Sequence, residues 1–205
     1  MKILDVNTWN RKQHFQHFNG LEDPSFAVTI PFDVTRAYKF SKENEVSFFG
    51  KYLHDCMKAI NSIESLKYRI IDNQVVEYEI IHASPTIMRD DKTFGFSFVE
   101  FDENLKVFLN NLEKEKQRIN SSDELFPEQE DLNCIYCSAM PWFQFTGHKE
   151  PFSKHGISVP KLSFSKAVKQ NDNLKMNVSI NVNHALVDGY HISLFVEKFQ
   201  DFLNQ

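Results

Sequence analysis

Apolar and polar residues alternate most regularly near the C-terminus of the chain. Every second residue from Leu174 to Val182 is apolar and the intervening residues are polar, a pattern that predicts a strand with one buried face. His184 continues the apolar phase of this strand. Asp188 and Gly189 then resemble the cap of a helix whose apolar residues follow helical spacing. The pattern therefore places a histidine between a buried strand and the last helix.

Similar patterns predict the other elements. Helical spacing predicts a helix that starts at Asn7 or Thr8, a second helix over residues 46–60 and a third helix that Asp102 caps. Further strands are predicted over residues 25–32, 66–71, 75–81, 93–101, 134–138 and 159–168. Residues 72–74 are the predicted turn of a hairpin, because Asp and Asn tolerate the positive φ that such turns need.

The order of these elements predicts the fold class. Strands and helices mix without a regular βαβ alternation, which favours an α+β fold, a two-layer sandwich of a mixed β-sheet with packed helices. A second hairpin is predicted with its turn at residues 169–173, and His184 ends its second strand. Surface loops are predicted over residues 121–131 and 147–156. At 205 residues the chain suits a single domain, residues 1–205.

Composition and charge exclude several kinds of partner. The formal net charge is -5 and there is no basic cluster, which argues against nucleic acid or an anionic membrane as a partner. No apolar run approaches transmembrane length and the N-terminus lacks a signal peptide, so the expected location is the cytoplasm. Three cysteines, an odd number, agree with a reducing compartment.

Two of the cysteines form a Cys-x-x-Cys pair, Cys134 and Cys137. Residues three apart in a strand point to opposite faces, and no second pair exists, so a metal or redox role is not expected. His14 and His17 also have metal-ligand spacing, but no third ligand lies near them in the sequence. The sequence thus predicts no metal site.

Three motifs together carry a resemblance to a known family. They are His-x-x-x-Asp-Gly at residues 184–189, the segment Trp-Asn-Arg-Lys-Gln-His-Phe at residues 9–15, and Ser-Ala-Met-Pro-Trp at residues 138–142, followed by Phe145. In this order and separation they resemble the chloramphenicol acetyltransferase family, over essentially the whole chain. Taken alone, the residue pattern favours a satisfied core histidine at position 184 and a turn-forming serine at position 138.

The resemblance implies a reaction and the residues that perform it. Acetyl-CoA and a small hydroxylated acceptor, chloramphenicol or a related alcohol, meet at His184, which acts as general base without an acyl-enzyme. Ser138 donates a hydrogen bond to the developing oxyanion. Ser163 stands where the family has a threonine that helps stabilise the transition state through a water molecule. Lys166 is a candidate for binding the CoA phosphate.

The resemblance also implies how the site is supported and assembled. Asp188 pairs with Arg11 and holds the architecture of the site, rather than orienting the histidine as in a Ser-His-Asp triad. A buried pair of this kind is costly to break on one side. The family forms compact homotrimers with active sites in the clefts between subunits.

Four departures from the family pattern bear on the acceptor. Asn183 replaces the first histidine of a His-His pair, and Val187 replaces a cysteine. Phe18 stands where a tyrosine is usual in the acceptor pocket, and Glu22 falls near an expected apolar residue. A carboxylate beside an apolar drug pocket is unfavourable unless it faces solvent or a polar acceptor. The sequence therefore leaves the acceptor open.

Two rival interpretations share part of the pattern. The catalytic domain of a dihydrolipoyl acyltransferase also carries His-x-x-x-Asp-Gly, but this chain lacks a lipoyl-bearing domain and its other two motifs fit the chloramphenicol group better. A non-catalytic homologue that binds a small molecule is the second alternative. Release of the CoA thiol distinguishes an enzyme from such a binding protein.

Overall fold

The computed structural model describes residues 1–128, 131–151 and 156–205. Its helices are α1 (Lys12–Phe18), α2 (Thr35–Glu43), α3 (Phe48–Asn61), a 3-10 turn (Glu64–Lys67), α4 (Leu105–Asn120) and α5 (Gly189–Leu203). Its strands are β1 (Lys2–Ile3), β2 (Ser25–Asp33), β3 (Tyr68–Ile71), β4 (Gln74–Glu77), β5 (His82–Met88), β6 (Phe94–Phe96), β7 (Cys134–Met140), β8 (Lys161–Ser165), β9 (Val168–Gln170) and β10 (Asn173–Asn183). The predicted loops 121–131 and 147–156 lie partly outside the described residues.

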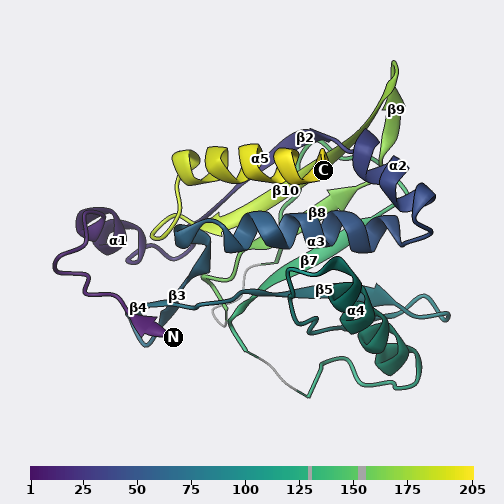
Figure 1. The fold of residues 1–205 in the computed structure, drawn as a ribbon. Coiled ribbons are helices and arrows are strands. Elements are labelled where there is room, and N and C mark those ends of the chain that lie inside the picture. The colour runs from purple at the N-terminus through teal and green to yellow at the C-terminus, as the bar shows by residue number, and fades with distance from the viewer. Residues whose placement is uncertain (129–130, 152–155) are drawn as a thin grey trace.

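A mixed sheet organises the molecule. Its strand order is β2-β10-β8-β7-β5-β6, and β9 extends the pairing of β10. β7 runs parallel to both β5 and β8, whereas β10 is antiparallel to β2 and β8. Helices α5, α3 and α4 lie side by side over the sheet (Figure 1). The predicted α+β sandwich is confirmed.

The hydrophobic core lies between the sheet and these helices. The predicted alternation along β10 is confirmed, since Met176, Val178, Ile180 and Val182 are all buried. The apolar stripe of α5 packs against the same layer, and the rings of Phe199 and Phe32 of β2 lie 4.8 Å apart. Burial of apolar area is the main favourable term in folding, so the helix layer is fixed mainly by these side chains.

A row of hydroxyl side chains crosses the sheet on the residues that alternate with the core positions. Ser138 of β7 is in register with Ser163 of β8, Ser163 with Ser179 of β10, and Ser179 with Thr29 of β2. Directly paired residues on neighbouring strands point to the same face of a sheet. The face opposite the helices is therefore polar at its centre.

The predicted hairpin turn at residues 72–74 forms between β3 and β4. Asp72 and Asn73 adopt positive φ angles of 48° and 61°, as predicted from their residue types. The second hairpin, β9 to β10, turns at Asn171, whose φ is 54°. Both turns fix the register of the strands that follow them.

Two predicted helix starts are wrong. α1 begins at Lys12 rather than at Asn7 or Thr8, because the Asn7 amide and the Thr8 hydroxyl both donate to Asp5 in a preceding turn. Asn104, not Asp102, is the N-cap of α4, and its Oδ1 accepts from the backbone N–H of the first helical turn. Competing local hydrogen bonds decided the start of both helices.

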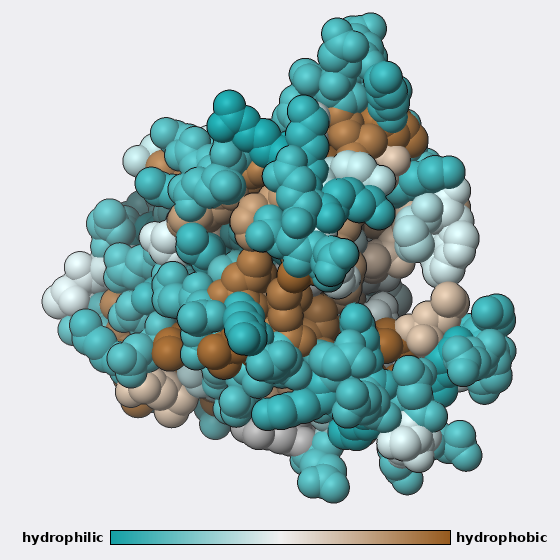
Figure 2. Space-filling model, turned by 45° about the vertical axis from the view of Figure 1, so that its right-hand side comes forward, coloured by the Kyte–Doolittle hydropathy of each residue, from teal (hydrophilic) through white to brown (hydrophobic). Residues whose placement is uncertain are grey.

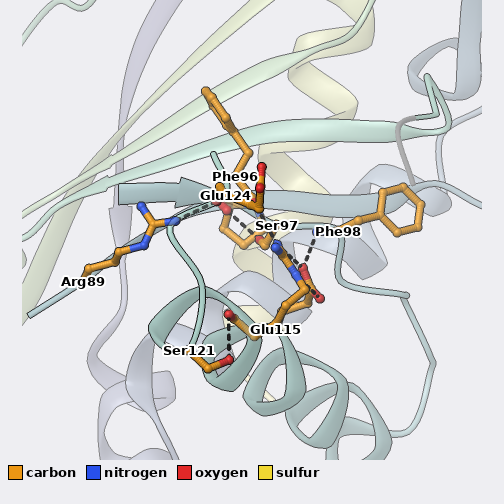
Figure 3. A network of polar contacts seen from close by, with 9 residues as sticks. Arg89, Phe96, Ser97, Phe98, Glu115, Ser121 and Glu124 are labelled. Carbon is orange, nitrogen blue, oxygen red and sulfur yellow. Dashed lines mark hydrogen bonds and ion pairs between the residues drawn. The ribbon is translucent and has the colours of Figure 1, made fainter. Parts of the chain in front are cut away.

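The predicted strand 93–101 is shorter than expected and ends at Phe96. Beyond it the backbone N–H of Phe98 donates to Glu115 of α4 at 2.9 Å, and the Ser97 hydroxyl donates to the Pro85 carbonyl (Figure 3). Arg89 donates hydrogen bonds to the backbone carbonyls of Phe94, Ile119 and Glu124. The segment returns to β5 only at Val99, which exchanges two backbone hydrogen bonds with Ala83, and side chains hold the residues in between.

Hydrophobic side chains are concentrated in the central part of one face, and hydrophilic residues cover most of its periphery (Figure 2). No helix in the described part of the chain combines the length and the apolar character needed to cross a membrane.

Candidate active site

His184 is the first residue after β10, and aromatic rings hold its side chain. Its backbone N–H donates to the Pro24 carbonyl at 2.8 Å. The imidazole stacks on Phe18 of α1, with ring centroids 4.0 Å apart and planes within 8°, and it also contacts Phe26 of β2. Nδ1 is buried, and no hydrogen-bond partner for it exists among the described residues. Ring packing, and not an acidic partner, therefore orients this histidine.

Arg11 and Asp188, four residues after His184, form an ion pair through Nη1 and Oδ2. Asp188 is also the N-cap of α5, where its Oδ1 accepts from the backbone N–H groups of Tyr190 and His191. Partial burial alone raises the pKa of Asp188, but the hydrogen bond and charge of Arg11, together with His191, lower it below the ordinary value. Asp188 thus ties the start of α5 to the segment before α1.

The same capping box fixes His191. Its Nδ1 accepts from the backbone N–H of Asp188 at 3.2 Å. Burial lowers the pKa of His191 below its ordinary value, although the charge of Asp188 opposes this. A neutral imidazole that accepts from a backbone amide agrees with that direction.

Ser138 lines a cavity of about 1030 Å³ on the polar side of the sheet. The cavity walls combine aromatic and apolar side chains, such as Trp142, Phe96 and Met140, with the charged residues Lys161 and Glu150. The hydrogen bonds of Figure 3 hold one of these walls, the segment that follows β6. The cavity has the volume and mixed lining of a small-molecule site.

A polar cluster that the sequence interpretation did not identify lies at this cavity. Ser163 donates its hydroxyl to Oε1 of Glu150 at 2.6 Å, and Nε2 of His148 lies 2.8 Å from the same oxygen. The hydroxyl predicted to act through water is therefore engaged by a carboxylate. The signal in the sequence was the pair of titratable residues two positions apart, shortly after the Pro-Trp turn.

His184 and Ser138 of one chain do not meet. Ser163 pairs in register with both Ser138 and Ser179, so these two residues lie two strands apart. His184 lies five residues after Ser179. With strands about 4.8 Å apart and about 3.3 Å per residue, the two Cα atoms are separated by roughly 19 Å. Neither side chain spans such a gap.

A second cavity, of about 610 Å³, lies between α2, the start of α3 and the end of β8. Three lysines line it, Lys39, Lys166 and Lys169, beside the aromatic rings of Tyr38 and Phe48. Lys166, the predicted phosphate ligand, is therefore one of a group of cations. Phe18 is not among the described residues that line either cavity, and its ring stacks on His184. Its place in the acceptor pocket stays a prediction.

The Cys-x-x-Cys pair is buried. Cys134 and Cys137 are free thiols, and burial raises the pKa of Cys134 to about 12, so the thiolate needed for redox or metal chemistry is not formed at neutral pH. Within the described residues, no group of three His, Cys, Asp or Glu side chains is arranged to hold a metal ion.

Comparison with known proteins assigns the family. The family model described as "Chloramphenicol acetyltransferase" matches residues 1–200. The chain belongs to the chloramphenicol acetyltransferase family. It is 28% identical over 199 residues to the chloramphenicol acetyltransferase of Bacillus pumilus, covering 96% of this chain and 90% of the relative. The protein is thus an acetyltransferase, as the three motifs predicted.

Solved structures agree with this assignment. One chloramphenicol acetyltransferase superposes with a TM-score of 0.87 at 27% identity, covering 98% of this chain and 99% of the other. The dihydrolipoamide acetyltransferase of Azotobacter vinelandii shares the fold, with a TM-score of 0.71 at 14% identity over 95% of this chain and 86% of the other. The family assignment favours the chloramphenicol acetyltransferase group over the dihydrolipoyl alternative.

Proposed function

We propose that this enzyme transfers the acetyl group of acetyl-CoA to a hydroxyl of a small molecule, with His184 as the general base. The observation that carries the proposal is the position of the His184 imidazole, which packs against Phe18 and Phe26 at the end of β10. The names of the relatives make chloramphenicol the first acceptor to test. The alternative is a homologue that binds such a molecule without reacting.

The chemistry follows from general base catalysis. His184 accepts the proton of the acceptor hydroxyl while the hydroxyl oxygen attacks the thioester carbonyl carbon. The tetrahedral intermediate collapses with cleavage of the C–S bond, and the imidazolium returns the proton to the CoA thiolate. No acyl-enzyme forms, because the acceptor oxygen is itself the nucleophile. Ser138 donates a hydrogen bond to the oxyanion, and loss of one such donor costs about 10²–10³ in rate.

The separation within one chain supports an active site shared between subunits. Because His184 and Ser138 lie roughly 19 Å apart, a neighbouring copy must supply the second residue if both act on one acetyl group. A heterologous interface that closes after three copies forms a ring with equivalent clefts. We therefore propose a homotrimer in which each cleft combines His184 of one subunit with Ser138 of the next.

The smaller cavity is the proposed site for part of CoA. Lys39, Lys166 and Lys169 offer positive charge for phosphate groups, and Tyr38 and Phe48 offer aromatic surface for the base. The protein as a whole carries a net charge of -5, so this local group of cations is notable. Arg11 and Asp188 are proposed to support the site, and the free cysteines suit a cytoplasmic location.

Substitution of His184 tests the proposal. We expect His184→Ala to abolish acetyl transfer, measured as CoA thiol release with chloramphenicol and a panel of alcohols, because only the proton acceptor is removed. The fold and acetyl-CoA binding should persist. His14→Ala, at an exposed histidine of α1, is the matched control. Near-normal turnover in His184→Ala rules out this base, and absence of thiol release from the wild type supports the binding-protein alternative.

A further inference from the structure

Glu150 places a carboxylate in the cavity that Ser138 lines. One of its oxygens, Oε1, receives both the Ser163 hydroxyl and the His148 ring nitrogen. None of the described residues hydrogen-bonds to the other oxygen, Oε2. Among the described residues, the carboxylate is therefore held through Oε1 alone.

The nearby cation attracts this carboxylate without forming an ion pair at hydrogen-bond distance. Lys161 lines the same cavity, but its Nζ donates to the Pro151 carbonyl at 2.6 Å, and no ion pair joins it to Glu150 among the described residues. Much of the surrounding wall is apolar, with Trp142 and Met140 among its residues. A carboxylate in such surroundings is costly unless a donor pairs with it.

The position of Glu150 relates it to the reacting centre. It is bonded to Ser163, and Ser163 is the register neighbour of Ser138 on the adjacent strand. Neighbouring strands lie about 4.8 Å apart. A substrate group that binds Oε2 of Glu150 therefore lies within a small molecule's length of Ser138, the proposed oxyanion donor.

We propose that Glu150 determines acceptor specificity by selecting alcohols that also carry an ammonium group. The proposal rests on the proposed function, because it takes the larger cavity as the acceptor site. An ammonium donates a charge-assisted hydrogen bond to Oε2, which is shorter and stronger than a bond between neutral groups. A neutral acceptor offers Oε2 at most a neutral donor, and such a hydrogen bond is weaker.

A matched pair of acceptors tests this selectivity. The probes are 2-amino-1-phenylpropane-1,3-diol and its N-acetyl derivative, which share the same hydroxyls and differ in the charge on nitrogen. We expect wild-type protein to prefer the amine by about 10- to 100-fold, both in kcat/KM and in affinity measured by calorimetry. Glu150→Gln should lose this preference and retain activity toward the N-acetyl compound, since the amide keeps the shape and an acceptor for Ser163.

Glu197→Gln is the control, because it removes the same charge from an exposed position on α5. It should leave the preference unchanged. An equal preference in wild type and Glu150→Gln, or a failure of the amine to bind the wild type, overturns the proposal. If calorimetry shows the preference and its loss in Glu150→Gln while no acceptor gives thiol release, the specificity inference holds and the proposed reaction fails.

Discussion

At the scale of single residues, the histidine and the aspartate of the His-x-x-x-Asp-Gly motif make separate sets of contacts. The ring of His184 packs against Phe18 and Phe26, whereas Asp188 binds Arg11 and the first turn of α5. Asp188 therefore does not contact the imidazole as the acid of a triad does. This division separates the proposed proton transfer from the support of the site.

Asp188→Asn tests the supporting role. We expect a loss of about 2–3 kcal/mol in the free energy of unfolding together with lower activity, because the mostly buried Arg11 loses its charge partner while some solvent screens Asp188. The change should appear as a lower melting temperature. Asp201→Asn, an exposed carboxylate on the same helix, should change little. Lower activity at an unchanged melting temperature would restore the role of Asp188 as an orienter of His184.

The pH dependence of this effect has a definite sign. The folded-state pKa of Asp188 lies below 3.8, so its ionised form contributes stability that is fully present above the unfolded pKa and is lost as the pH falls through the folded value. The stability difference between wild type and Asp188→Asn should therefore shrink below about pH 4.

At the scale of an element, α3 carries a buried ion pair in the helix layer. Lys51 Nζ lies 2.6 Å and 2.7 Å from the two carboxylate oxygens of Asp55, one turn further along the helix. Both side chains are buried, and burial raises the pKa of Asp55 to about 6 although Lys51 acts to lower it. The pair therefore satisfies the two charges at a considerable desolvation cost.

A double-mutant cycle measures this balance. Asp55→Ala should reduce the free energy of unfolding by about 3–5 kcal/mol, because it leaves the Lys51 ammonium buried and unpaired. Adding Lys51→Met should recover most of that loss. Urea denaturation of the two single variants and the double variant gives the coupling energy. If the double variant is as unstable as Asp55→Ala, the pair contributes net stability and the desolvation argument is wrong for this helix.

At the scale of the whole molecule, the separation of His184 and Ser138 determines the expected assembly. A heterologous cleft makes each site depend on two chains. His184 is not among the described residues that line either of the two cavities, which offer the proposed acceptor and CoA sites. The proposed active site therefore needs two copies of the chain.

Mixing two impaired variants tests this assembly. An equal mixture of His184→Ala and Ser138→Ala chains, unfolded and refolded together, should recover about one quarter of wild-type activity. Each cleft then has about even odds of an intact histidine and, independently, of an intact serine. The Ser138→Ala background, about 10² below wild type, leaves this recovery visible. Activity equal to the mean of the two separate variants, or a monomer by light scattering, contradicts the shared cleft.

The sequence by itself determined the elements and the motif residues. The alternation along residues 174–182 and the helical stripe of α5 are local properties, because side-chain hydrophobicity and spacing decide which face is buried. The tertiary structure alone decided that Glu150 reaches Ser163 and that His184 and Ser138 are far apart. Each of these depends on the path of the chain and on competition among polar partners, neither of which leaves a periodic signal in the sequence.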